Sequence, residues 1–147
     1  MSNGTKVKKR DGRIESLNLD KMHVMVDEAT KDLAGVSASQ VEMKSGIQFY
    51  DGITTAEIQE ILIRSASDLI DLDHPNYQYV AARLLLFSLR KSLYGKIRDL
   101  PHLEEHIYSC TNLEVYDRDI FTKYSKEEID KANGFIDHKR DFLFTYA

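Results

Sequence analysis

Five cationic side chains lie within a short stretch near the start of the sequence, on either side of an Asp-Gly pair. The stretch reads KVKKRDGRIESLNLDK, and its cations are Lys6, Lys8, Lys9, Arg10 and Arg13. Arg offers a planar fork of donors that suits phosphate oxygens, and Lys adds a mobile point charge. The pattern therefore favours the binding of a phosphate group, with a solvated charged turn as the structural alternative.

A β-hairpin is expected to carry these cations. Asp11-Gly12 stands between two short β-compatible runs, residues 7–9 and 14–17. An Asp-Gly pair in this setting is a strong hairpin signal, because Gly adopts positive φ without a Cβ clash. The sequence predicts a two-stranded hairpin with Lys9 and Arg10 at its turn.

Nucleic acid is a second candidate for a basic patch. However, the patch is one turn long, the net charge of the chain is −4, and basic residues do not cluster along a helix. A small phosphate-bearing ligand is the better match. Lys91, with Arg90 before it, can supply a further cation if the fold brings the end of their helix to the hairpin.

Composition limits the other classes of function. With 147 residues and 42% hydrophobic content, the chain suits one domain, or a small domain with an appendage. It contains neither an apolar run of membrane-span length nor the apolar core of a signal peptide, so we expect a soluble, cytoplasmic protein. The single cysteine, Cys110, excludes an internal disulfide, a Cys-rich zinc site and a redox pair within the chain.

Two shorter motifs could carry other chemistry. His102-Leu-Glu-Glu-His106 fits the H-x-x-E-H pattern of zinc peptidases, but no third ligand stands out downstream, so an exposed polar helix face is favoured. The run from Asp137 to Asp141 contains a histidine between acids, yet no nucleophile can be tied to it, and a structural salt-bridge cluster is favoured. Cys110 is interpreted as an ordinary helix residue.

Apolar spacing and capping signals predict a mostly helical chain. Capping boxes begin at Ser37, Thr54 and Ser125. Leu69 and Leu72 are expected to extend the apolar stripe of the third helix, and the fourth is apolar on most of its circumference, which predicts the most buried helix. The expected helices are 19–33, 37–49, 54–72 and 76–94, followed by shorter ones near 102–110, 117–122 and 126–136.

The expected fold class is mainly α, with a small N-terminal β-hairpin capping a four-helix unit and a short helical extension after it. We place the division at residues 1–95 and 96–147. Four apolar side chains near the end of the extension are expected to pack against another surface. They are Phe142, Leu143, Phe144 and Tyr146.

Several long motifs, in order along the chain, resemble one family. VKKRDGRIESLNLDK, QFYDGITTAEIQ and YQYVAARLLLFSLRKSLYG together resemble the ATP-cone, the nucleotide-binding module at the N-terminus of many ribonucleotide reductases. YSKEEIDKANGFIDHKRDFLFTYA is similar to the segment that follows the ATP-cone in the large subunit of class I ribonucleoside-diphosphate reductases. In that family the ATP-cone is an allosteric activity site, where ATP permits reduction and dATP stops it.

The resemblance implies a set of site residues and ligands. It implies ATP or dATP as the effector, Mg²⁺ accompanying the nucleotide, and no metal held by protein side chains. The phosphates would lie at Lys9, Arg10 and Lys91, and Gln59 would belong to the same site. Around the base and sugar the resemblance places Val7, Glu15, Asn18, Lys21 and Thr55, with Leu17 where the family often has isoleucine.

Three positions depart from the dATP-inhibited bacterial pattern. Glu57, Gln59 and Ser88 stand where that pattern commonly has Asp, His and His. Gln59 cannot carry a charge and Ser88 is shorter and neutral, so polar contacts to the nucleotide are altered. These departures lead to the hypothesis that the nucleotide binds while inhibition by dATP is weakened.

The family also defines partners. Its members need a barrel domain with three active-site cysteines, which a chain with one cysteine does not encode. The resemblance therefore implies a fragment, or one piece of a split large subunit, that is not an enzyme by itself. The expected partners are the remainder of the large subunit and the small radical-generating subunit, without nucleic acid or membrane. The alternative is a structural piece that completes the large subunit and has a degenerate nucleotide site.

Overall fold

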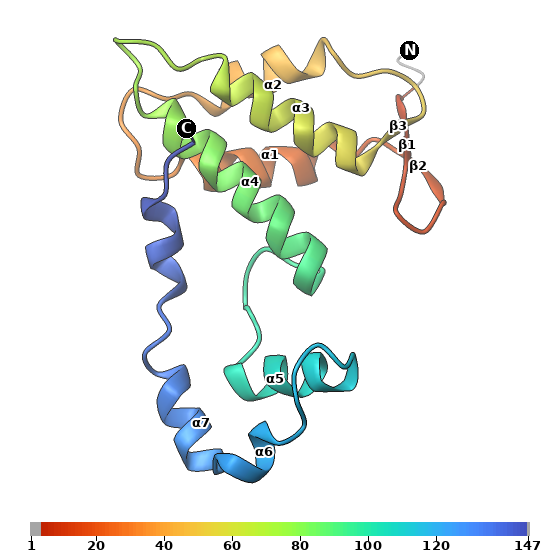
Figure 1. Ribbon diagram of the computed structural model, residues 1–147. Helices are drawn as coiled ribbons and strands as arrows, with labels where there is room; N and C mark the ends of the chain where they lie inside the picture. Colours follow the sequence, from red (N-terminus) through yellow and green to blue (C-terminus); the bar gives the residue numbers. More distant parts are fainter. Residues whose placement is uncertain (1–3, 147) are drawn as a thin grey trace.

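The computed structural model describes residues 4–146, so the outer ends of the two predicted units, residues 1–3 and 147, lie outside the described residues. Four helices pack into one body with a small sheet at one end, and the later helices of the chain lie below this body in the view of Figure 1. The mainly α fold with an N-terminal hairpin is confirmed. The first unit contains β1 (Lys6–Lys8), β2 (Ile14–Ser16), α1 (Leu19–Thr30), α2 (Ala38–Gly46), β3 (Ile53–Thr54), α3 (Thr55–Ser67) and α4 (Tyr77–Tyr94).

The hairpin is present, and it gains a strand that the sequence did not reveal. β1 pairs antiparallel with β2 and parallel with β3, giving the order β2-β1-β3. Gly12 has φ 85° and its N–H donates to the carbonyl of Lys9, which makes the tight turn. Asp51 ties the third strand in, since its carboxylate accepts from the Lys6 N–H at 2.7 Å. The sheet is thereby joined directly to the start of α3.

The core lies among α1 to α4 and reaches the sheet. Fully buried side chains come from each of these helices, and β1 and β3 add Val7 and Ile53. Burial of apolar area on this scale is the main stabilising term of such a fold. The hairpin is therefore fastened to the helices by its own apolar residues. The fully buried aliphatic residues of the four helices include Val26, Val41, Leu62 and Val80.

The third helix is shorter than predicted. It ends at Ser67, and Leu72 is fully exposed, so its expected place in the apolar stripe was wrong. The carboxylate of Asp71 accepts from the backbone N–H groups of Asp73 and His74, at 2.9 and 2.6 Å. This local turn competes with helical hydrogen bonding just before Pro75.

Two of the three capping boxes form in full. At Thr54 and at Ser125 the side chain and the glutamate three residues later bond reciprocally. Ser37 accepts from the Gln40 N–H, but the Gln40 side chain instead accepts from the Tyr77 hydroxyl at 2.9 Å. That hydroxyl in turn accepts from the Ser37 N–H at 3.0 Å. A tertiary contact with α4 therefore replaces half of the expected cap.

The helix expected to be most buried is buried on one side only. α4 packs on α3 and α1 through a set of buried residues. On its other side, Leu85, Leu89 and Leu93 remain 49%, 53% and 61% exposed. The apolar circumference of α4 is therefore covered on one side, although α4 still has more buried residues than any other described helix. The buried residues of α4 are Tyr77, Val80, Ala81, Leu84, Phe87 and Arg90.

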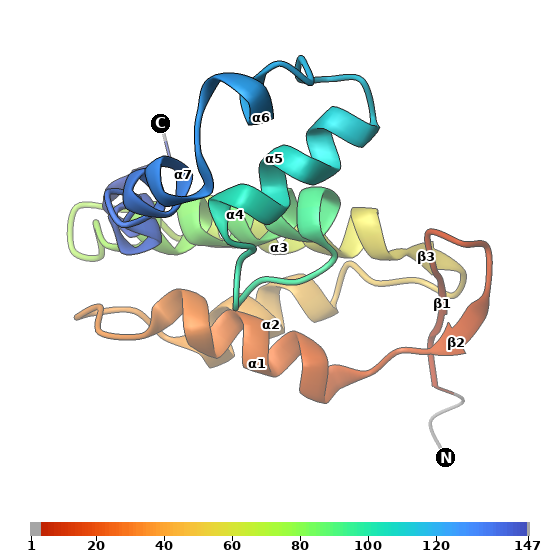
Figure 2. The ribbon, with the colours of Figure 1, turned by 90° about the horizontal axis from the view of Figure 1, so that it is seen from below.

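The extension leaves α4 at Gly95, whose φ of 72° lets the chain turn away. It forms α5 (Leu103–Asn112), α6 (Ile120–Lys123), α7 (Lys126–Asn133) and a 3₁₀ helix, η1 (His138–Leu143). The chain then returns to α4, so that η1 packs against it (Figures 1 and 2). None of the helices in residues 4–146 is long and apolar enough to cross a membrane.

Phe142 anchors this return. Its ring meets Phe87 edge-on at 6.1 Å, and the guanidinium groups of Arg83 and Arg90 lie 5.1 and 5.5 Å from its centre. Cation–π contacts of this kind add to the apolar packing. The predicted packing of the terminal apolar cluster is met for Phe142, whereas Leu143 and Phe144 stay exposed.

Candidate functional site

A hollow of about 100 Å³ lies beneath the hairpin, bounded by α1, α3 and α4. The first turns of α1 and α3 lie at the sheet end of the molecule (Figure 2). The last turn of α4 reaches the same place through Lys91. The lining residues are Val7, Lys9, Ser16, Leu17, Asn18, Lys21, Met22, Met25, Thr55, Ile58, Gln59 and Lys91.

Most residues predicted for the site line this hollow. Those that do are Val7, Lys9, Leu17, Asn18, Lys21, Thr55, Gln59 and Lys91. Arg10 and Glu15 do not, because Arg10 is exposed on the turn and Glu15 forms ion pairs with Lys9 and Arg13, at 3.5 and 3.4 Å. Their proposed contacts with a nucleotide stay predictions, as do those of the lining residues.

Four lining residues were not predicted as site residues. Met22, Met25 and Ile58 recur at helical spacing, a pattern that indicates core, although their side chains also form walls of the hollow. Ser16 sits at the end of β2. Apolar walls suit the flat faces of a ring, but periodicity alone cannot separate a wall from a core.

Two of the three lysines that line the hollow have no anionic partner among the described residues. Within residues 4–146 the lysines that form ion pairs are Lys9, Lys44 and Lys123, so Lys21 and Lys91 have none. Burial, followed by the charges of Lys9, Arg10 and Lys21, lowers the pKa of the Lys91 ammonium. Lys91 therefore lies close enough to these three groups for mutual repulsion, which an anion would relieve.

Gln59 adds an unmet acceptor. Its side chain is 7% exposed and lines the hollow, and its Oε1 has no hydrogen-bond partner anywhere in the described part of the chain. A buried polar atom without a partner carries a desolvation cost that a ligand donor would remove. An amine or a hydroxyl is the kind of group that could donate to it.

Of the three departures from the bacterial pattern, only Gln59 lines the hollow. Glu57 is occupied by the cap of α3, because its carboxylate accepts from the N–H and hydroxyl of Thr54 and from the Tyr50 hydroxyl. These bonds, led by that of the Thr54 side chain, lower the pKa of Glu57. Ser88 is half-buried on α4 and is not among the lining residues.

A second hollow of about 340 Å³ adjoins the first. The two share Asn18, Lys21, Met25 and Lys91, so the two lysines stand at the junction between them. The second hollow is otherwise lined by Asp20, Val24 and Ile97. A ligand could therefore place an apolar part under the hairpin and an anionic part at the junction.

The histidines of the H-x-x-E-H motif face different partners. Nε2 of His102 lies 3.5 Å from Asp130 on α7, while Nε2 of His106 lies 3.6 Å from Sγ of Cys110, one helical turn away on α5. In residues 4–146 the donors close enough to share an ion are those of His102, Glu104 and Asp130, without His106. The two-histidine arrangement of a zinc peptidase is therefore not formed there.

His102 is already engaged in holding helix ends together. Its Nδ1 accepts from the Glu104 N–H, so a neutral ring carries its proton on Nε2, toward Asp130. The charged run from Asp137 to Asp141 is structural as well. Asp137 caps η1, and Asp141 pairs with Arg90 of α4 at 2.9 Å.

Comparison with known proteins identifies the family. Residues 5–92 match the family model described as the ATP cone domain. The chain belongs to the ATP-cone family. The match begins just before β1 and ends one residue after Lys91, so it contains every residue that lines the hollow beneath the hairpin.

The relatives extend the likeness over the whole chain. The chain is 48% identical to the Haemophilus influenzae ribonucleoside-diphosphate reductase subunit alpha and 47% identical to the Escherichia coli ribonucleoside-diphosphate reductase 1 subunit alpha, in each case over all 147 residues. It is also 43% identical to the ribonucleoside-diphosphate reductase subunit alpha of Enterobacteria phage T4, over 77% of the present chain. It spans 19% of the first two relatives, matching their N-terminal region.

Proposed function

We propose that this ATP-cone binds ATP or dATP between the hairpin and the helices, and that it is the allosteric regulatory module of a class I ribonucleotide reductase large subunit. The observation that carries the proposal is the hollow beneath the hairpin, where Lys91 is held near three other cations and Gln59 keeps an unpaired acceptor. Several cations suit a triphosphate, and an acceptor suits an adenine amine or a ribose hydroxyl.

The two hollows suggest how the nucleotide would lie. The base and sugar would occupy the space beneath the hairpin, against apolar walls such as Leu17 and Ile58. The phosphates would lie at the junction marked by Lys21 and Lys91, with Lys9 and Arg10 closing over them. Mg²⁺ would arrive with the triphosphate rather than on protein side chains.

The size of the first hollow bears on how the ligand enters. Its volume of about 100 Å³ is well below the roughly 300 Å³ at which ligand pockets usually begin. We therefore expect the hairpin to act as a lid that lifts when the nucleotide enters. Its turn projects from the sheet, which is linked to α3 through β3, so the turn is the part freest to move.

The large subunit supplies the setting for this module. The relatives are named as reductase alpha subunits, and the chain matches about a fifth of their length. We propose that residues 1–95 form the nucleotide-binding unit and that residues 96–147 begin the connection to the remaining subunit. The module would act on reduction by the complete enzyme, with the small subunit as a second partner, and would not be an enzyme by itself.

A structural role without nucleotide binding is the competing proposal. Under it, the fold would complete the large subunit while its site is degenerate. Gln59, which stands where the inhibited pattern has histidine, favours a milder version in which nucleotide binds and dATP inhibits weakly. Assay of the assembled reductase with dATP tests the milder version. Full inhibition at ordinary dATP levels would contradict it.

Calorimetric titration of the 147-residue chain with ATP and with dATP tests the binding. We expect one nucleotide per chain and a loss of about tenfold in affinity on Lys9→Ala, since a charge-assisted contact to phosphate is worth about 1.5 kcal/mol. Lys123→Ala, on α6 of the extension, is the matched control and should bind normally. Absence of binding heat at millimolar nucleotide would support the structural alternative.

A further inference from the structure

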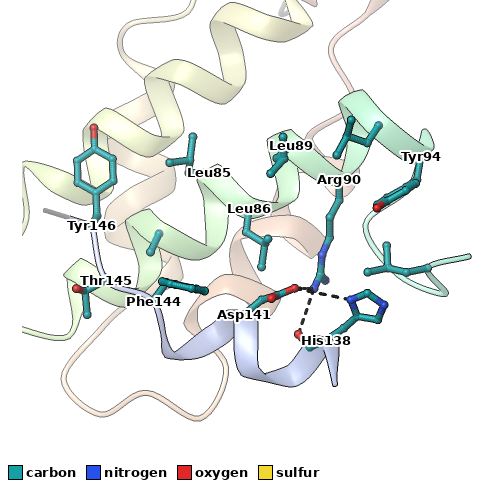
Figure 3. A pocket seen from close by; sticks show the side chains of 13 residues that line it. Leu85, Leu86, Leu89, Arg90, Tyr94, His138, Asp141, Phe144, Thr145 and Tyr146 are labelled. Atoms are coloured by element: carbon teal, nitrogen blue, oxygen red, sulfur yellow. Dashed lines mark hydrogen bonds and ion pairs between the residues drawn. The ribbon is translucent and has the colours of Figure 1, made fainter. Parts of the chain in front are cut away.

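An apolar groove of about 410 Å³ runs along the open side of α4 (Figure 3). Its floor is formed by α4, and its opposite wall by η1 and the residues after it. Leu85 and Leu89 line it from α4, and Phe144, which is 70% exposed, lines it from the chain after η1. This contiguous apolar surface exceeds the scattered exposed leucines that are normal on a soluble domain.

The spacing of the floor residues indicates what shape would fill the groove. Ala82, Leu86, Leu89 and Leu93 follow one another at intervals of three or four along α4, with Leu85 beside them. Residues at this spacing form the ridge that packs into the grooves of a neighbouring helix. An amphipathic helix is therefore the complementary occupant.

The charges of the groove are already paired. Arg90 donates to the Asp141 carboxylate at 2.9 Å and to the His138 carbonyl at 3.3 Å (Figure 3). Its other terminal nitrogen donates to the Ile97 carbonyl at 3.2 Å. The groove thus offers little to an anionic small molecule, and its attraction is mainly apolar.

The path of the chain identifies the source of such a helix. The Tyr146 N–H donates to the Gln78 carbonyl, which places the end of the described chain beside the first turn of α4. From Gln78 to Leu93, α4 rises roughly 22 Å, a distance that a helix of about 15 residues spans. The relatives continue for about four-fifths of their length beyond the matched region. The polypeptide that follows in them starts at one end of the groove.

We propose that the groove is the docking surface for an apolar helix of the remaining large-subunit polypeptide. The inference rests on the proposed function for the identity of the partner, and it does not depend on nucleotide binding. The same helix α4 then carries the effector site through Lys91 and the docking surface through Leu85 and Leu89. Docking and effector binding would share one rigid element.

Thiol labelling of a full-length chimera tests the docking. The matched region of the Haemophilus influenzae alpha subunit is replaced by this chain, and Leu85→Cys is labelled with a maleimide, read by peptide mass spectrometry. We expect labelling about tenfold slower, or more, in the chimera than in the isolated chain, because the site is then reached only through local opening. Leu89→Cys should repeat the result. Leu72→Cys, fully exposed outside the groove, should label equally in both.

Two results would overturn the proposal. The first is equal labelling of Leu85→Cys in the chimera and in the isolated chain. The second is sedimentation of the isolated chain as a dimer whose Leu85→Cys is protected until dilution, because a second copy would then be the occupant. ATP titration of the same samples tests the proposed function separately. If ATP does not bind but Leu85→Cys is protected in the chimera, the proposed nucleotide binding fails while the docking proposal stands.

Discussion

Arg90 and Lys91 are consecutive residues in the last turn of α4, yet their charges meet opposite surroundings. Arg90 is buried, and its donors are taken by a carboxylate and two backbone carbonyls of the extension. Lys91 is partly buried on the hairpin side, near other cations, and forms no ion pair within residues 4–146. A paired buried charge holds segments together, whereas an unpaired one marks a place where an anion is missing.

The comparison predicts that the two substitutions separate stability from binding. Arg90→Ala should lower the free energy of unfolding by about 3 kcal/mol, because Asp141 loses its partner and the contact with Phe142 is lost. ATP affinity should change by less than about threefold, since Arg90 and the nucleotide share no partner. Urea unfolding and calorimetry measure the two. A loss of ATP affinity as large as the loss of stability would contradict the separate roles of Arg90 and Lys91.

Lys91→Ala should show the reverse pattern. Loss of one charge-assisted contact with phosphate should weaken ATP binding about 10- to 100-fold. The unliganded protein should be as stable as before or slightly more stable, because repulsion among the cations is relieved. Lys96→Ala, just past the end of α4, serves as the control. Unchanged ATP affinity in Lys91→Ala would place the phosphates elsewhere.

Gln59→Leu tests the same contrast between paired and unpaired groups for a neutral side chain. It removes the unpaired Oε1 at nearly constant volume, so affinity for ATP should fall about three- to tenfold while unliganded stability does not fall. Titration with both ATP and dATP shows which ligand group donates to Gln59. A loss seen with ATP but not with dATP would identify the 2′-hydroxyl. A drop in unliganded stability would mean that Gln59 is already satisfied in the free protein.

The depressed pKa of Lys91 predicts a pH dependence with a definite sign. The folded state favours the neutral amine, so the charged form opposes folding at pH values below the folded-state pKa. Unliganded stability should therefore gain as pH rises through that pKa, toward the ordinary 10.5, by about 0.5 kcal/mol after solvent screening. ATP binding should weaken over the same window. Lys91→Met should lack both effects in parallel unfolding and binding series.

His23 provides the smallest effect, from a paired charge on the surface. The hydrogen bond to Glu42, at 2.7 Å, and then the charge of Glu42 raise the pKa of His23 above 6.5. The contribution of this pair to stability is fully present below pH 6.5 and is lost as pH rises through the folded-state pKa. His23→Gln should remove a slight pH dependence there, seen by thermal unfolding, and leave ATP binding unchanged.

Local signals predicted most of the elements. The Asp-Gly turn, the helix starts at Thr54 and Ser125 and the end of α4 at Gly95 all appear as expected. The information for each of these lies in a few neighbouring residues, through backbone sterics and capping hydrogen bonds. Where a distant group competes, local prediction was wrong, as at Gln40, whose side chain bonds Tyr77 rather than its own helix start.

The candidate site was predicted in part, by its resemblance to a family. Eight of the ten predicted residues line the hollow, while Glu15 is engaged by Lys9 and Arg13. β3 escaped prediction because a two-residue strand has no periodicity, and it exists only through its pairing with β1. Met22, Met25 and Ile58 were not predicted as site residues, because the wall of a hollow and a core show the same helical spacing of apolar residues.

By itself, the sequence determined the cations, the turn that presents them and where most helices begin, because these depend on side-chain chemistry and short-range hydrogen bonds. Only the tertiary structure decided which charges are paired. Arg90 and Lys91 are one residue apart, and about 100° of helix rotation turns one toward Asp141 and the other toward the hairpin. What each then meets depends on segments some 50 to 80 residues away along the chain, whose positions are set by packing.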